Sequence, residues 1–259
     1  MDAIQWFYYL PLWVLYGGTI LIVFLAFEGG FQLGRLRKRR SEGTAASPVG
    51  SMVGATLGLL AFMLSFTFAT ASSHFDARKQ VVFEESNAIR TVYGLADMIP
   101  EPIHKKISAL LREYVDVRLQ KVRTREELRS FMDHSEKIHE QLWSEVMDYE
   151  VKNPGRINSF FVESLNEMID IHAKRVTIAL RWNIPITIWI LLYAVMALGI
   201  SSMGFHAGLL GARGSFSYLV LVLAFSIVMV LIADLDRPRQ GLFNVNQKSM
   251  IELRQRMSE

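Results

Sequence analysis

Four apolar stretches, each about as long as a membrane-crossing helix, dominate the pattern of this sequence. A helix needs about 20 apolar residues to cross the hydrocarbon core of a bilayer, and it must satisfy its backbone hydrogen bonds internally because lipid offers no partners. The first stretch contains one charged residue, Glu28, and the other three contain none. We therefore predict an all-α polytopic membrane protein with four spanning helices, at about residues 12–33, 50–73, 184–203 and 216–233.

The segment between the second and third stretches has a different pattern, with apolar residues recurring at the spacing of amphipathic helices. Its 17 basic and 18 acidic residues indicate a solvated domain of nearly neutral charge. We expect the second span to continue as one long helix up to Pro100, where Pro100 and Pro102 predict a break. Asn153-Pro154-Gly155 predicts a second turn. The predicted division is spans one and two with their basic loop (1–73), a helical extramembrane domain (74–182), spans three and four (183–234) and a C-terminal tail (235–259).

Basic residues are concentrated after the first span, where the loop of residues 34–49 carries five of them. By the positive-inside rule this loop lies in the cytoplasm, which puts the N-terminus, the 74–182 domain and the C-terminus on the non-cytoplasmic side. The contrast is partial because the flanks of the inserted domain and the tail also carry Lys and Arg. The net charge of +3 is too small and too localised to indicate nucleic-acid binding.

The second stretch carries a repeat of small and aromatic residues four positions apart. Glycines at this spacing let two helix backbones approach closely, either within one subunit or between subunits. The phenylalanines that continue the same face could line and close a pore in a ring of identical subunits, or simply pack or face lipid. Hydroxyl side chains make this the most polar span, although they can also bond to their own helix. The candidates are Gly50, Gly54 and Gly58 for packing, and Phe62, Phe66, Ser65 and Thr70 for a pore or gate.

Few residues suggest chemistry. Asp234 and Asp236 leave the fourth stretch together, and such oxygens suit a hard cation like Ca²⁺; the alternative is a helix-ending turn paired with nearby arginines. The sequence has no cysteine, no paired histidines at metal-binding spacing and no nucleophile or phosphate-binding motif. His172 falls on an apolar helical face and is expected to be a packed core histidine. We therefore expect no enzyme, no confident metal site and no cofactor beyond a candidate ion.

Three short motifs resemble the bestrophin-like membrane family, in matching order and spacing from about residue 50 to residue 257. The first is Phe83-Glu-Glu-Ser-Asn-Ala-Ile89, which contains Glu85 and Asn87. The second joins Pro185 to Trp189, and the third joins Asp236 and Pro238 to Gly241.

The resemblance implies a distant relation to bestrophins, which are pentameric anion channels with a phenylalanine-bearing neck on the second span and a calcium clasp after the fourth. Phe62 and Phe66 suit the neck, whereas the acidic run of the clasp is missing here. Bestrophins also keep their inserted region in the cytosol, opposite to the orientation that the basic loop favours.

We accordingly expect a homo-oligomeric, anion-conducting channel in the lipid bilayer of a bacterial inner membrane, with a pentamer as the family precedent and the second span lining the pathway. The alternative is a non-conducting scaffold or sensor whose helical domain binds a partner or ligand.

Overall fold

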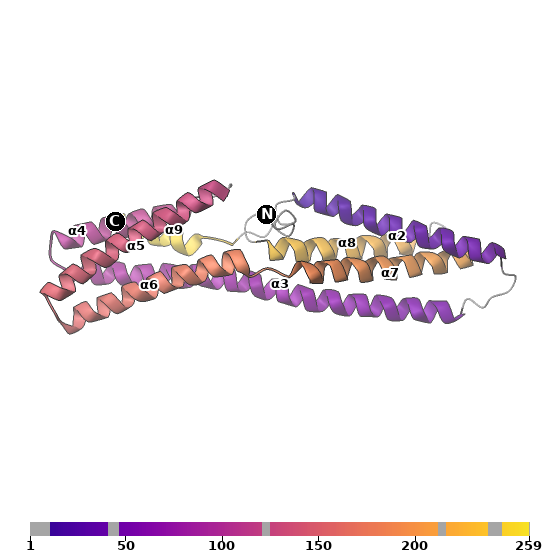
Figure 1. Cartoon of the computed structure of the whole chain (residues 1–259), viewed down its shortest axis with the longest axis horizontal. Coiled ribbons are helices and arrows are strands. Elements are labelled where there is room, and N and C mark those ends of the chain that lie inside the picture. The colour runs from indigo at the N-terminus through magenta and orange to yellow at the C-terminus, as the bar shows by residue number, and fades with distance from the viewer. Residues whose placement is uncertain (1–10, 41–46, 121–124, 212–215, 238–244, 259) are drawn as a thin grey trace. The chain divides into compact units, whose positions relative to one another are not determined.

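The computed structural model describes residues 11–40, 47–120, 125–211, 216–237 and 245–258, in which helices are joined by short turns and no strand occurs. Its helices are α2 (Leu12–Arg40), α3 (Ser47–Ala96), α4 (Ile103–Leu119), α5 (Arg125–Lys152), α6 (Arg156–Arg181), α7 (Ile186–Leu210), α8 (Phe216–Asp236) and α9 (Lys248–Arg256) (Figure 1). Four segments are long and apolar enough to cross a membrane: Trp13–Arg40, Gly50–Ala96, Ile186–Leu210 and Leu219–Asp236. The predicted all-α class with four spans is confirmed.

The chain forms two compact units, which we call the membrane unit (residues 1–75 and 182–244) and the helical domain (residues 76–181 and 245–259). Helix α3, with 50 residues, contributes its first part to the membrane unit and its second part to the helical domain. The predicted continuation of the second span as one long helix is therefore confirmed. The last residues of the chain, which we expected to form a separate tail, belong to the helical domain.

In the membrane unit, α2 lies along α7 and also contacts α8 (Figure 1). The core between the helices is apolar and fully buried at Leu60, Leu192, Met196 and Ile200. Helix α7 ends at Gly211, whose φ of 77° is favourable for glycine because it has no Cβ. The Gly211 N–H donates to the carbonyl oxygen of Ala207 at 2.9 Å and closes the helix end.

The helical domain is built from α4, α5 and α6 packed in sequence, with the second part of α3 and with α9 against α4. Helix α4 begins directly after Pro102, and α5 and α6 are separated by the Asn153-Pro154-Gly155 turn, as the sequence predicts. Apolar side chains of α9 are buried in the domain core. Arg254 adds a two-pronged ion pair with Asp116, at 2.5 and 3.0 Å.

Candidate functional site

The first part of α3 has one buried face and one exposed face. Leu60, Leu64, Thr67 and Ala71 are buried in the membrane unit. The opposite side of the helix is exposed and consists mainly of glycine, alanine, serine and phenylalanine, with the exposed aliphatic side chains of Met52 and Leu59 along one edge. We call it the open face, and its members are Ser51, Gly54, Ala55, Gly58, Phe62, Ser65, Phe66, Ala69 and Ser73.

The open face brings together most of the pore candidates predicted from the sequence. Phe62 is 70% exposed and Phe66 is 69% exposed, one helical turn apart. Ser65 lies beside them, whereas Thr70 is half-buried at the edge of the face and its hydroxyl donates to the Phe66 carbonyl oxygen at 3.1 Å. Two large apolar rings flanked by small and hydroxyl-bearing residues therefore point away from the rest of the chain.

The three glycines of the predicted packing ladder behave differently from one another. A Cβ at Gly50 would lie 3.4 Å from Nε2 of His206, which is a close contact with α7. A Cβ at Gly54 or Gly58 would meet nothing within 4 Å. Among the described residues of one chain, Gly54 and Gly58 therefore pack against no other helix.

Two further glycine pairs, which were not among the residues predicted from the sequence, lie where the backbones of α2 and α7 approach each other most closely. A Cβ at Gly30 would collide with the backbone carbonyl of Ser201, and one at Gly34 with that of Phe205. In return, Cβ atoms at Gly204 and Gly208 would collide with carbonyls of α2. We call this contact the α2–α7 seam. Its signal was present in the sequence as two glycine pairs, each with four-residue spacing.

A buried ionic cluster occupies the core of the helical domain, centred on Glu85 of α3. The Tyr114 hydroxyl donates to Oε1 of Glu85 at 2.7 Å and lies 2.8 Å from Nδ1 of His172. Arg118 Nη2 donates to Oε2 at 3.3 Å, and Arg175 Nη1 donates to the same oxygen. Three helices thus converge on one carboxylate that is fully buried.

The charges of this cluster shift its titrations in definite directions. Burial acts to raise the pKa of Glu85, but the guanidinium groups of Arg118 and Arg175 outweigh it and hold that pKa well below its usual value. Burial, reinforced by the negative charge of Glu85, raises the pKa of Tyr114. Burial also lowers the pKa of His139 to about 3. The carboxylate is therefore ionised and His139 neutral across the physiological range.

His139 and His172 complete the cluster, with ring centroids 4.8 Å apart and edge to face. The Nε2 atom of His139 is buried without a hydrogen-bond partner. His172 is buried as predicted, but it is bonded within a polar network and not packed only among apolar side chains. Asn87, two residues from Glu85, is half-buried outside this network. Its backbone carbonyl oxygen accepts a hydrogen bond from the Thr91 hydroxyl at 3.1 Å.

Asp236 connects the end of α8 to the beginning of α7 through hydrogen bonds. Both of its carboxylate oxygens accept the Ile184 backbone N–H, at 3.1 Å each, and Oδ1 lies 3.4 Å from Nδ1 of His74. Pro185 caps α7, and the Trp189 side chain that follows is buried. Two of the resembling motifs, the one with Pro185 and the one with Asp236, therefore meet at one helix junction.

The cation site suggested by Asp234 and Asp236 stays a prediction. Both residues are buried, and the hydrogen bonds of Asp236 show that it already serves the chain itself. No group of three His, Cys, Asp or Glu residues suited to a metal occurs in the part of the chain that the structure describes. Pro238 and Gly241 of the third motif lie outside the described residues.

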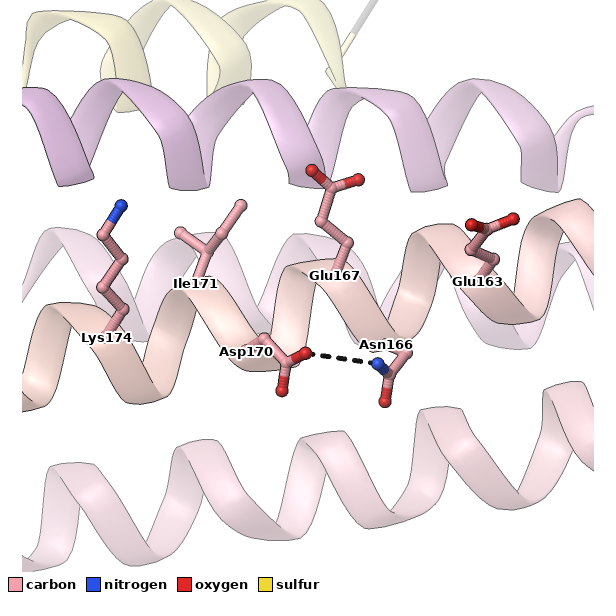
Figure 2. A pocket seen from close by; sticks show the side chains of 6 residues that line it. All are labelled: Glu163, Asn166, Glu167, Asp170, Ile171 and Lys174. Carbon is pink, nitrogen blue, oxygen red and sulfur yellow. Dashed lines mark hydrogen bonds between the residues drawn. The ribbon is translucent and has the colours of Figure 1, made fainter.

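The surface of the helical domain has a shallow groove along α6 (Figure 2), lined by Glu163, Asn166, Glu167, Asp170, Ile171 and Lys174. Lys174 donates to Glu84 of α3 at 2.8 Å, and Asn166 donates to Asp170 at 3.2 Å. These are pairs between exposed polar side chains, as expected for a solvated helix face.

Comparison with known proteins supports the assignment suggested by the motifs. The structure resembles a bacterial bestrophin homologue from Klebsiella pneumoniae, with a TM-score of 0.67 at 14% identity, covering 94% of this chain and 96% of that chain. One single-substitution variant of the Klebsiella pneumoniae homologue gives a TM-score of 0.68 at 13% identity, covering 96% of this chain and 99% of that chain. A second variant gives a TM-score of 0.69 at 14% identity, covering 93% of this chain and 95% of that chain. A search of curated proteins finds no match. The bestrophin-like domain model matches residues 17–250. The chain therefore belongs to the bestrophin-like family, which is a family of membrane channels and not of enzymes.

Proposed function

We propose that this chain assembles with identical copies into a ring around an anion-conducting pore lined by the open face of α3. The observation that carries the proposal is the exposure of Phe62 and Phe66 on a face made mainly of glycine, alanine and serine, with large aliphatic side chains only at its edge, at Met52 and Leu59. A lipid-facing side of a helix is ordinarily covered by large aliphatic residues. The open face instead offers mostly small and hydroxyl-bearing surface, with two bulky rings on successive helical turns.

The two phenylalanines suit a constriction that is closed by dewetting. A ring of apolar side chains can expel water from a narrow passage without a charged or mobile plug. The edge of an aromatic ring carries partial positive charge, so rings presented edge-on to the axis favour an anion over a cation. The open face also carries no carboxylate, which would attract cations and repel anions.

The test begins with the mass of the particle in detergent or nanodiscs, because a pore on this face needs several copies around it. A closed ring is expected, and a monomer or dimer would exclude a central pore and favour the scaffold or sensor alternative. Chloride flux from liposomes then tests the lining. Replacing Phe62 and Phe66 with Ala should raise flux severalfold, because the apolar constriction widens.

Phe24→Ala is the matched control for this experiment. Phe24 is 60% exposed and lies within the apolar stretch of α2, so it is a similarly exposed ring on a different helix from the open face. Its flux should equal that of the unaltered protein. If the Phe62→Ala, Phe66→Ala and Phe24→Ala variants all conduct chloride at the rate of the unaltered protein, a pore at Phe62 and Phe66 is contradicted. Equal permeation of potassium and chloride would contradict anion selection.

We also propose that the basic end of α2 faces the cytoplasm, so that the helical domain lies on the opposite side. The positive-inside rule supports this orientation, whereas bestrophins as a family have the reverse. The absence of native cysteine allows a direct test with single introduced cysteines. At Lys152, which is exposed in the helical domain, a cysteine should react with a membrane-impermeant maleimide in intact spheroplasts. At Arg40 a cysteine should not, and the opposite result would reverse the orientation.

A further inference from the structure

The membrane unit has a concentrated cationic end. Five of the six residues from Arg35 to Arg40 are basic, and all five are exposed. The membrane unit contains five acidic residues, and of these only Glu28 and Glu42 lie within ten residues of the cluster in sequence. The positive charge of the cluster therefore exceeds the negative charge near it in sequence.

Four of these five side chains have no protein partner among the described residues. Lys38 is used internally, because its Nζ donates to the Leu210 carbonyl oxygen at 3.2 Å and neutralises the C-terminal end of α7. Arg35, Arg37, Arg39 and Arg40 form no ion pair or hydrogen bond in the described part of the chain. Four guanidinium groups are therefore available to an external ligand.

The length of the apolar stretch places these groups at a definite depth. At a rise of 1.5 Å per residue, the predicted first span of residues 12–33 is roughly 33 Å long, which matches a hydrocarbon core of about 30 Å. The residues that follow then lie at the level of the lipid phosphates. Arg and Lys also extend their side chains toward that level.

The distribution of the arginines around α2 suits many small ligands better than one protein groove. Arg35 and Arg39 share one side of the helix, whereas Arg37 and Arg40 lie on others, because successive residues are rotated by about 100°. A protein partner would need one continuous face. Separate phosphate groups, each able to accept two parallel hydrogen bonds from a guanidinium, can surround the helix.

We infer that the arginines at the end of α2 bind the headgroups of anionic phospholipids in the adjoining leaflet. The partner chemistry is a phosphodiester monoanion at the membrane surface whose headgroup carries no positive charge of its own, held by charge-assisted hydrogen bonds and by the positive field of the cluster. This inference is independent of pore formation and of which leaflet adjoins the cluster.

Native mass spectrometry of the purified, delipidated protein tests this binding. Titration with phosphatidylglycerol should give retained lipid adducts at concentrations at least tenfold lower than titration with phosphatidylcholine. The quadruple variant Arg35→Gln, Arg37→Gln, Arg39→Gln, Arg40→Gln should lose this preference, with Lys38 kept so that the end of α7 stays capped. The corresponding quadruple Arg→Lys variant should keep most of it, because the charge remains.

The matched control removes the same charge elsewhere. Arg90, Arg129, Lys137 and Arg156 are exposed on the helical domain, and replacing them with Gln should leave the preference unchanged. If the quadruple α2 variant fails to fold, the double variants Arg35→Gln, Arg39→Gln and Arg37→Gln, Arg40→Gln should each lose part of the preference.

Three outcomes would overturn the inference. The first is equal retention of the two lipids by the unaltered protein, and the second is an unchanged preference in the α2 variants. The third is full competition by millimolar glycerol phosphate, which would mean that the cluster binds a free phosphate and not a lipid.

Discussion

Two regions of the membrane unit are built on glycines four residues apart, and they have opposite environments. At the α2–α7 seam, the glycines let two backbones approach so closely that no Cβ fits. On the open face of α3, Gly54 and Gly58 have nothing within 4 Å of where a Cβ would lie. The same spacing therefore marks a contact completed within one chain in the first region and a surface still exposed in the second. Spacing alone indicates that a helix can be approached closely, and only the structure shows by what.

The seam can be broken at Gly30. The variant Gly30→Ala places a methyl group against the Ser201 carbonyl, which must move together with its helix. Overpacking typically costs about 1–3 kcal/mol. Because the added methyl group meets backbone atoms, which cannot move aside as a flexible side chain can, we expect the free energy of unfolding to fall by about 3 kcal/mol or more. The thermal unfolding temperature in detergent measures it.

The neighbouring residue supplies the control. A Cβ at Gly29 meets nothing within 4 Å, so Gly29→Ala should leave the unfolding temperature unchanged or slightly raised. Similar losses for the two variants would mean that the seam is not a tight backbone contact.

The helical domain also has a contact completed within one chain, but a charged one. Glu85→Gln leaves Arg118 and Arg175 facing each other without their shared carboxylate. Removing one partner of a buried ion pair costs about 3–5 kcal/mol, and we expect a loss in the lower part of that range because Gln keeps the shape. Chemical unfolding of the full chain, followed by a probe in the helical domain, measures it.

Glu84→Gln is the control for Glu85. Glu84 pairs with Lys174 at the surface, where both side chains are partly exposed. Exposed pairs contribute about 0–1 kcal/mol, so this variant should be nearly neutral. A neutral Glu85→Gln would show that the cluster does not stabilise the domain.

The fold was largely predictable, whereas the sites were predictable only in part. Long apolar stretches and the Pro100 and Asn153 breaks are local signals, so four spans and the order of the helices could be predicted. The partners of Glu85 could not, because Arg118 and Arg175 reach it from helices 33 and 90 residues away in sequence. The seam glycines carry the same local signal as the α3 ladder, glycines four residues apart. Only the three-dimensional packing distinguishes the two.

Acid should weaken the Glu85 cluster in a definite pH window. His139 has its folded pKa lowered from 6.5 to about 3, and it faces Tyr114, His172, Glu85 and Arg118. Its contribution to stability is complete above the unfolded pKa of 6.5 and is lost as pH falls toward 3, because the unfolded chain takes up the proton first. Glu85, with its pKa also lowered, adds to the loss below pH 4.5.

Between pH 6.5 and 4.5, His139 alone should remove about 2 kcal/mol from the free energy of unfolding of the helical domain. Urea unfolding at a series of pH values measures the slope. His139→Gln, which cannot be protonated, should flatten this part of the profile and leave the Glu85-dependent part below pH 4.5. An unchanged slope in this variant would assign the acid sensitivity to other groups.

The smallest effect on the single chain is expected on the open face, where the comparison with the seam is sharpest. Gly58→Leu adds a large side chain where nothing lies within 4 Å, so the unfolding free energy of the dissociated chain should change by less than about 1 kcal/mol. If copies of α3 approach one another along this face, the same change should reduce particle mass or chloride flux. Gly18→Leu, at an equally open position on α2, should alter neither. A Gly58→Leu protein with unaltered assembly and flux would mean that lipid, and not a second subunit or a pore, covers the open face.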